Sequence, residues 1–313
     1  MNIPFKEKVK AYLDLTRAHF AIVWPLLFCS GLMLAFRNYG GFSWSLIIRV
    51  FFIGLFGFEA GMVLNDILDR NVDQIEPDPT MTNYWRPFKQ RPIPSGLISI
   101  KEALILFGIF ILITIGLIAT LPYPNFLYVY GVMIYAYSVE SFYNIIKRNQ
   151  NFPFAQLVGR TDLAVFPIAG YLCFGQFDTY ILLFIVFLYP WALAHLATND
   201  IIDFENDKVK DLKTIAVLYG NKGNLIWIYM TSLLHFVMTG IFLFYGGFSY
   251  IALGGFAFSL ILILSANIVV STQKTNQRKL LSLPMFHASL LVYIIAIILD
   301  TVLLPSTALI SFL

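Results

Sequence analysis

An acidic motif of the form N-D-I-x-D-x-x-x-D occurs twice in this sequence, at residues 65–73 and again at residues 199–207. If a helix continues through each copy, the first, fifth and ninth positions share one face, because they lie four residues apart. The residues at these positions are Asn65, Asp69 and Asp73 in the first copy, and Asn199, Asp203 and Asp207 in the second. Each copy therefore predicts a row of side chains that carry oxygen ligands.

Carboxylates gathered in this way repel one another unless a cation joins them. Carboxylate and amide oxygens suit Mg²⁺, which usually keeps some waters and takes substrate phosphates as its remaining ligands. Neither motif contains His or Cys, which argues against zinc or copper. The two motifs therefore predict a magnesium site, with Mg²⁺ as cofactor and the six face residues as its ligands.

Basic and aromatic side chains near the motifs can supply the positive charge that a diphosphate needs beyond the metal. Arg91 opens the turn R-P-I-P-S-G, Lys213 follows the second motif, and Tyr143 lies one helical turn before Lys147. For each cation the alternative role is that of a topological anchor. The predicted substrate-binding residues are Arg91, Tyr137, Tyr143, Lys147, Arg148 and Lys213.

The elements that must position these residues are membrane helices. Of the 313 residues, 58% are hydrophobic and 12% are charged, against roughly 45–50% and 25% in soluble domains. This composition argues strongly against a water-soluble fold. The net charge of +3 gives no reason to expect a nucleic-acid partner, and none is predicted. The two cysteines lie in apolar runs, so neither a disulfide framework nor a cysteine metal site is supported.

Nine apolar runs are long enough to cross a bilayer as helices. They cover residues 19–36, 46–64, 103–121, 126–142, 154–174, 180–197, 225–245, 250–270 and 284–304. We therefore predict an all-α, polytopic integral membrane protein with nine transmembrane helices, forming one domain over residues 1–313. The fifth run carries Arg160 and Asp162, and a charge inside the bilayer is by default a candidate functional residue.

Lys and Arg residues gather in the N-terminal segment and in the loops after the second, fourth, sixth and eighth runs. The positive-inside rule places these segments in the cytoplasm. The N-terminus and both acidic motifs are then predicted to be cytoplasmic, within segments 65–101 and 199–223, and the C-terminus is predicted to lie on the opposite side of the membrane.

Taken together, these motifs resemble the UbiA superfamily of intramembrane prenyltransferases. The matching features are the acidic motif after the second run, R-P-I-P-S-G soon after it, a Tyr/Lys-Arg segment after the fourth run and D-x-x-x-D after the sixth. The resemblance implies a helical bundle around a central cavity, in which the motif residues hold Mg²⁺ on the diphosphate of a prenyl donor. It also implies that Arg91, Lys147 and Lys213 contact that diphosphate.

The function implied is transfer of a prenyl group, within the membrane, from an isoprenyl diphosphate to a lipophilic or aromatic acceptor, with release of diphosphate. The first motif resembles branches that prenylate chlorins or archaeal glycerolipids. The second is closer to the naphthoate and geranylgeranylglyceryl phosphate branches, and it lacks the Asp-Asp pair of the 4-hydroxybenzoate enzymes. The sequence thus does not decide whether the acceptor is a quinone precursor, a chlorin or a glycerolipid. Asp66 or Asp200 is our hypothesis for the catalytic carboxylate that assists deprotonation.

Two alternative functions are compatible with the same residues. A terpene cyclase of the UbiA type would ionise the same donor and close the prenyl chain on itself. A secondary transporter would also show duplicated acidic motifs in its two halves. Transporter sites generally lie near the bilayer midplane, whereas both motifs here lie at the cytoplasmic boundary.

Overall fold

The computed structural model describes residues 3–303, and every regular element in this range is a helix. The prediction of an all-α fold is therefore confirmed for the described part of the chain. The predicted end of the ninth run, Leu304, and the C-terminus lie outside the described residues.

The long helices carry the apolar runs. They are α2 (Val23–Tyr39), α3 (Trp44–Asp69), α5 (Ile100–Ala119), α6 (Asn125–Ile146), α8 (Thr161–Leu172), α9 (Thr179–Ile202), α11 (Ile215–Gly246), α12 (Tyr250–Thr272) and α14 (Ser282–Leu303). The short elements are α1 (Phe5–Leu15), η1 (Val72–Gln74), α4 (Thr80–Trp85), α7 (Phe154–Gly159), α10 (Phe204–Val209) and α13 (Asn276–Lys279).

Within residues 3–303, six helices are long and apolar enough to cross a membrane: α3, α5, α9, α11, α12 and the segment Asn276–Leu303 that ends in α14. The three other predicted runs fall on elements that do not meet this measure. The first run forms α2, which has 17 residues, and the fourth forms α6, which carries Glu140 and Asn144. The fifth is divided at Arg160 into α7 and α8. Polar residues and a helix break thus leave the count of nine unconfirmed.

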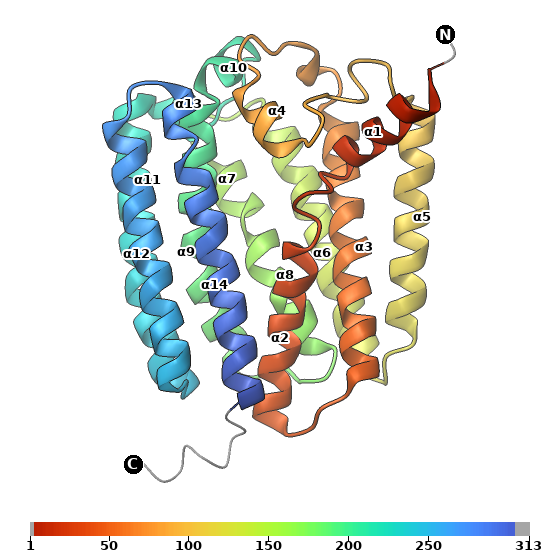
Figure 1. Ribbon diagram of the computed structural model, residues 1–313, viewed down its shortest axis with the longest axis vertical. Helices are drawn as coiled ribbons and strands as arrows, with labels where there is room; N and C mark the ends of the chain where they lie inside the picture. The colour runs from red at the N-terminus through yellow and green to blue at the C-terminus, as the bar shows by residue number, and fades with distance from the viewer. Residues whose placement is uncertain (1–2, 304–313) are drawn as a thin grey trace.

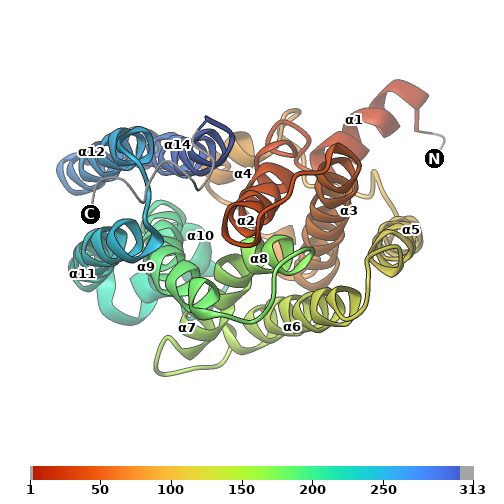
Figure 2. The same ribbon diagram turned by 90° about the horizontal axis from the view of Figure 1, so that it is seen from below.

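The long helices stand side by side, as Figure 1 shows from the side and Figure 2 from below. Neighbours along the chain pair in space: α3 packs on α2 and α5, α9 on α11, and α12 on α14. The short helices α1, α4, α10 and α13 gather at one end of the bundle, which we call the motif end (Figure 1). The last turn of α14 lies at the opposite end.

Two glycines allow α2 and α8 to pack in direct backbone contact. A Cβ atom at Gly31 would lie 1.8 Å from the carbonyl oxygen of Pro167, and one at Gly170 would lie 1.8 Å from that of Phe28. No larger residue fits at either position without displacing a helix. This contact holds α8 against α2, so that the start of α8 forms one wall of the cavity described below.

Neither acidic motif is one continuous helix. α3 ends at Asp69, and Asp73 falls in η1, while α9 ends at Ile202 and Asp207 falls in α10. The four-residue spacing predicted that each motif would form one face of a single helix. This prediction is wrong, because each long helix ends before the last aspartate of its motif. In the second motif the backbone N–H groups of Asp203 and Asp207 still donate to the carbonyl oxygens four residues earlier, so this segment keeps a nearly helical path.

Candidate functional site

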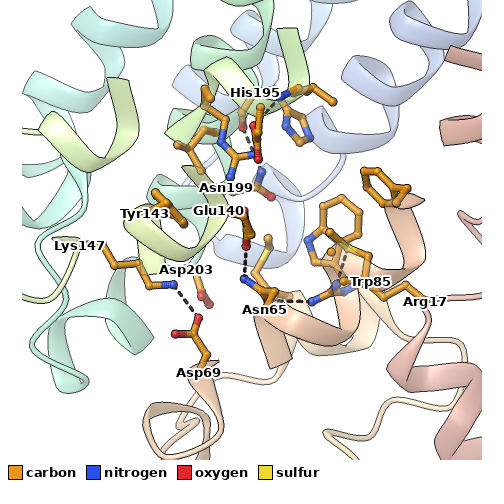
Figure 3. A pocket seen from close by; sticks show the side chains of 18 of the residues that line it. Arg17, Asn65, Asp69, Trp85, Glu140, Tyr143, Lys147, His195, Asn199 and Asp203 are labelled. Carbon is orange, nitrogen blue, oxygen red and sulfur yellow. Dashed lines mark hydrogen bonds and ion pairs between the residues drawn. The ribbon is translucent and has the colours of Figure 1, made fainter. Parts of the chain in front are cut away.

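A cavity of about 320 Å³ opens between the two acidic motifs and extends into the bundle. Its walls come from α3, α6, α8 and α9, with α4 and the segments after α3 and α9 at the motif end. All six predicted metal ligands line it, and so do Asp200, Arg91, Tyr137, Tyr143 and Lys147. Figure 3 shows several of these side chains pointing toward one another from different helices.

The carboxylates of the first motif are paired with cations. Lys147 Nζ lies 2.6 Å from Asp69 Oδ2, and an Arg148 nitrogen lies 3.0 Å from Asp69 Oδ1. Asp73 contacts Arg91 at 2.5 Å and Lys210 at 3.0 Å. Burial alone would raise the pKa of Asp73, but the charges of Arg91 and Lys210 hold that pKa below its usual range.

The carboxylates of the second motif lack such partners. No Lys or Arg nitrogen of the described residues lies within 4 Å of Asp203 or Asp207. Burial raises the pKa of Asp203 to about 6, although a hydrogen bond from Asn206 opposes this shift. Burial and the neighbouring Asp203 and Asp200 raise the pKa of Asp207 well above its usual range. The carboxyl groups of the second motif therefore have no direct ion-pair partner, and Lys210 and Arg91 act on Asp203 only from beyond 4 Å.

The second motif fits a hard cation. The side-chain oxygen of Asn199 is buried and accepts no hydrogen bond, and it lines the cavity together with the carboxyl groups of Asp203 and Asp207. Amide and carboxylate oxygens are the donors that Mg²⁺ prefers. In residues 3–303 no three His, Cys, Asp or Glu side chains are grouped closely enough to form a ready-made metal site. The first-motif residues are engaged elsewhere: Asp69 and Asp73 with cations, and the oxygen of Asn65 with Arg17 at 3.3 Å.

Aromatic residues form the inner part of the cavity. Tyr137 donates its hydroxyl hydrogen to the carbonyl oxygen of Gly57 at 2.8 Å, which fixes its ring at the wall. Trp24 stacks on Phe58 with ring centroids 4.2 Å apart, and Phe58 contacts Phe166 at 5.6 Å. The cavity therefore has a charged end at the motifs and an aromatic end deeper in the bundle.

Three predicted site residues do not line the cavity. Asp66 follows Asn65 directly and so lies on another face of α3, where it pairs with Arg86 at 2.8 Å and Arg17 at 3.1 Å. Arg148 contacts Asp69 from outside the cavity, with 39% of its side chain exposed. Lys213 is half-exposed and pairs with Asp211 at 2.5 Å.

Several cavity residues were not predicted from the sequence as part of the site. The signal for Glu140 was available, because Glu140, Tyr143, Asn144 and Lys147 are spaced along one face of α6. Glu140 Oε1 accepts hydrogen bonds from Asn65 and Asn144 at 2.9 and 2.8 Å. The cations missed are Arg17, Arg86 and Lys210, and Trp85 was missed as well, whereas Arg160 and Asp162 were noted from the sequence only as charges inside the fifth run, without an assigned role.

Comparison with known proteins identifies the family. The UbiA prenyltransferase family matches residues 22–290, and the chain belongs to this family. It is 27% identical over 226 residues to a 4-hydroxybenzoate octaprenyltransferase of Vibrio atlanticus, covering 70% of this chain and 72% of that protein. The predicted family and its enzyme class, a prenyltransferase, are thereby confirmed.

Solved structures share the fold at low sequence identity. A UbiA homologue from Aeropyrum pernix K1 is 19% identical and has a TM-score of 0.74, covering 90% of this chain and 98% of that one. A UbiA homologue from Archaeoglobus fulgidus bound to GPP and Mg²⁺ is 18% identical and has a TM-score of 0.65, covering 92% and 99%. The bundle described here is thus the fold of this membrane-protein family.

Proposed function

We propose that this protein transfers a prenyl group from an isoprenyl diphosphate to a lipophilic acceptor within the membrane, with Mg²⁺ as cofactor. The observation that carries the proposal is the single cavity with both acidic motifs and several cations at one end and aromatic rings at the other. The diphosphate belongs at the charged end and the prenyl chain at the aromatic end. The solved relative with GPP and Mg²⁺ supports this choice of donor and cofactor.

The acidic residues are assigned to the metal. Asn199, Asp203 and Asp207 would hold Mg²⁺ together with the first-motif carboxylates, and the bound ion would neutralise the diphosphate so that it leaves more readily. Neither Asp203 nor Asp207 has a counter-ion within 4 Å among the described residues. A divalent cation held there would offset the repulsion between Asp203 and Asp207.

The basic residues are assigned to the leaving group. Lys147, Arg91 and Lys210 now share two carboxylates, Asp69 and Asp73, and all five residues line the cavity. When the donor is present, these cations can donate charge-assisted hydrogen bonds to the oxygens of the diphosphate. Charge on the leaving group grows as the allylic bond breaks, so these contacts stabilise the transition state more than the bound donor.

The aromatic end protects the allylic carbocation. Rings of Trp24, Phe58, Tyr137 and Phe166 exclude water from this part of the cavity, and their faces attract positive charge. Capture by an acceptor then competes with ring closure of the chain, which keeps a cyclase as the alternative outcome of the same ionisation. Membership of a prenyltransferase family favours transfer over the transporter alternative.

The proton that the acceptor loses needs a base. Of the two carboxylates predicted for this role, Asp200 lines the cavity, although one of its oxygens accepts a hydrogen bond from the Ile215 amide at 3.1 Å. Asp66 is held by Arg17 and Arg86 away from the cavity. We therefore assign deprotonation to Asp200 and a structural role to Asp66.

For the topology we propose nine spans, with α2, α6 and the broken α7–α8 segment added to the six apolar helices. These three lie within the bundle beside the apolar helices (Figure 2), and α2 packs on α3, α8 and α14. The basic loops then place the motif end in the cytoplasm and the C-terminus on the other side.

The test is release of diphosphate by the purified protein in lipid nanodiscs. Prenyl diphosphates of increasing length are offered with 4-hydroxybenzoate, a naphthoate, a chlorin or a glyceryl lipid as acceptor. We expect release with Mg²⁺, almost none after chelation, and recovery when Mg²⁺ is restored. Failure of every donor to react at saturating Mg²⁺ would refute the proposed function.

A further inference from the structure

One cation in the cavity differs from all the others. Six cations line it: Arg17, Arg86, Arg91, Lys147, Arg160 and Lys210. Each of the other five forms at least one ion pair with a carboxylate, at distances from 2.5 to 3.1 Å. In the part of the chain that the structure describes, the guanidinium of Arg160 forms neither an ion pair within 4 Å nor a hydrogen bond, and its Nε is buried.

The position of Arg160 follows from the break in the fifth apolar run. It is the residue between α7 and α8, so its side chain leaves the backbone where the helix is interrupted. Its neighbour Gly159 packs directly against Tyr143, because a Cβ at Gly159 would lie 2.7 Å from the Tyr143 ring. The guanidinium carbon of Arg160 lies 5.2 Å from the centre of that ring. The arginine is therefore held in place by backbone and ring packing and not by a counter-ion.

Tyr143 also locates Arg160 relative to the diphosphate. Lys147 Nζ lies 4.8 Å from the centre of the same ring. The Lys147 ammonium and the Arg160 guanidinium therefore lie at most about 10 Å apart. A ligand with a single aromatic ring can span the distance between the diphosphate end and Arg160.

The carboxyl groups of Asp162 and Glu140 also line the cavity, but they accept hydrogen bonds from groups other than Arg160. Asp162 Oδ1 accepts from the Leu163 amide at 2.5 Å, and Glu140 Oε1 accepts from Asn65 and Asn144. Neither lies within 4 Å of the Arg160 guanidinium. They therefore leave the N–H groups of the Arg160 guanidinium without a partner among the described residues.

We propose that Arg160 binds an anionic group of the acceptor, and that the acceptor is an aromatic acid whose carboxylate lies against this guanidinium. The inference rests on the proposed function and narrows the acceptor class that the sequence left open. A planar guanidinium offers two parallel N–H groups to a carboxylate. A buried arginine without an ion-pair partner lowers the stability of the fold, and a bound anionic ligand would supply that partner. The ring of such an acid would extend past Tyr143 toward the donor.

The test compares an acid with its uncharged counterpart. Prenyl transfer is measured with 4-hydroxybenzoate and with its methyl ester, using wild type, Arg160→Gln, Arg160→Lys and the control Lys10→Gln on exposed α1. We expect wild type to prefer the acid by about tenfold or more in kcat/KM.

Arg160→Gln should lose about ten- to a hundredfold in kcat/KM with the acid, as expected for a lost charge-assisted contact. With the ester it should change less than about twofold, because no charged contact is lost. Arg160→Lys should keep part of the preference, because it keeps the charge and loses the planar fork.

The donor side provides the structural control. The KM for the prenyl diphosphate and the thermal midpoint should be the same in wild type and Arg160→Lys, since neither depends on the acceptor's charge. Equal losses with acid and ester in both Arg160 variants, or equal use of the two acceptors by wild type, would overturn the proposal. A phosphorylated glycerolipid used in preference to the acid, with that preference lost in Arg160→Gln, would overturn the carboxylate assignment. Absence of diphosphate release with every acceptor is a different result, because it refutes the proposed function itself.

Discussion

The molecule buries two groups of charged residues at opposite ends of the same bundle, and they are built differently. At the end opposite the motifs, Arg37 of α2 pairs with Asp300 of α14 at 3.0 Å, with side chains 6% and 1% exposed. Asp300 also accepts hydrogen bonds from the backbone and side chain of Ser249, and Arg37 lies over the ring of Phe248. At the motif end, by contrast, lysine and arginine side chains pair with the first-motif carboxylates. Asp203 and Asp207 have no such cation within 4 Å in the described residues.

The difference separates a structural pair from a site. Arg37 and Asp300 form an ion pair, join α2, α12 and α14, and do not line the cavity. The charges at the motif end line a cavity and are unbalanced locally, with positive charge concentrated at the first motif and negative charge at the second. Burial of charge alone therefore does not mark the site. The site is marked instead by an open cavity that is lined by charged groups without fixed partners.

The largest effect is expected from Asp203→Asn. The variant loses a ligand of the metal site, so Mg²⁺-dependent transfer should fall by about a hundredfold or more. The thermal midpoint should not fall, because the change removes an uncompensated buried charge. Steady-state diphosphate release and thermal unfolding measure the two effects. Asp211→Asn is the matched control, since Asp211 is 84% exposed and its one ion pair within residues 3–303 is with Lys213.

The opposite result is expected at the other end of the bundle. Asp300→Asn leaves Arg37 buried without a counter-ion, and breaking such a pair costs about 3–5 kcal/mol of stability. Activity per folded molecule should stay near that of wild type. The double variant Arg37→Met with Asp300→Leu should recover much of the lost stability. If Asp300→Asn instead reduced kcat in well-folded protein, the division between structural pair and site would be wrong.

Lys147→Gln and Arg91→Gln test whether cations of the site act by position. Each should weaken use of the prenyl donor by about ten- to a hundredfold, the effect of one charge-assisted hydrogen bond. Kinetics with the donor varied measure this effect, and Lys10→Gln serves as the anchor control. Small and equal changes in all three variants would reduce these residues to topological anchors.

The smallest effects come from a matched pair of lysines three residues apart. Lys210 is 3% exposed, lines the cavity and contacts Asp73, whereas Lys213 is 31% exposed and contacts Asp211. Lys210→Gln should raise the donor KM about tenfold, and Lys213→Gln should change it less than about twofold. A larger loss in Lys213→Gln would show that this residue reaches the diphosphate during turnover.

The sequence predicts the acidic part of the site well because that part is repeated. Spacing alone selected Asn65, Asp69, Asp203 and Asp207, and all of them line the cavity although the helices end earlier than expected. Asp66 was assigned to the site only as a carboxylate near the metal ligands, and adjacency in sequence does not show that its side chain leaves α3 in another direction.

What the sequence could not predict depends on contacts between distant segments. Lys210 contacts Asp73, and Arg86 contacts Asp66, only because the fold brings segments that are distant in sequence together. The fifth apolar run gave no signal of where its helix breaks, so the exposure of Arg160 to the cavity was not predictable. The sequence showed that Arg160 is a charged residue within an apolar run, but it did not show whether Arg160 has a counter-ion.

The central claim is that both acidic motifs act on one metal–diphosphate complex in one cavity. Its most direct test is Mg²⁺-dependent binding of labelled inorganic diphosphate to wild type, Asp69→Asn, Asp203→Asn and the double variant. We predict that each single variant loses Mg²⁺-dependent binding and that the double variant binds no worse than the weaker single one, because coupled residues are not additive. Near-normal binding by either single variant at saturating Mg²⁺, or losses that simply add in the double variant, would contradict a shared site.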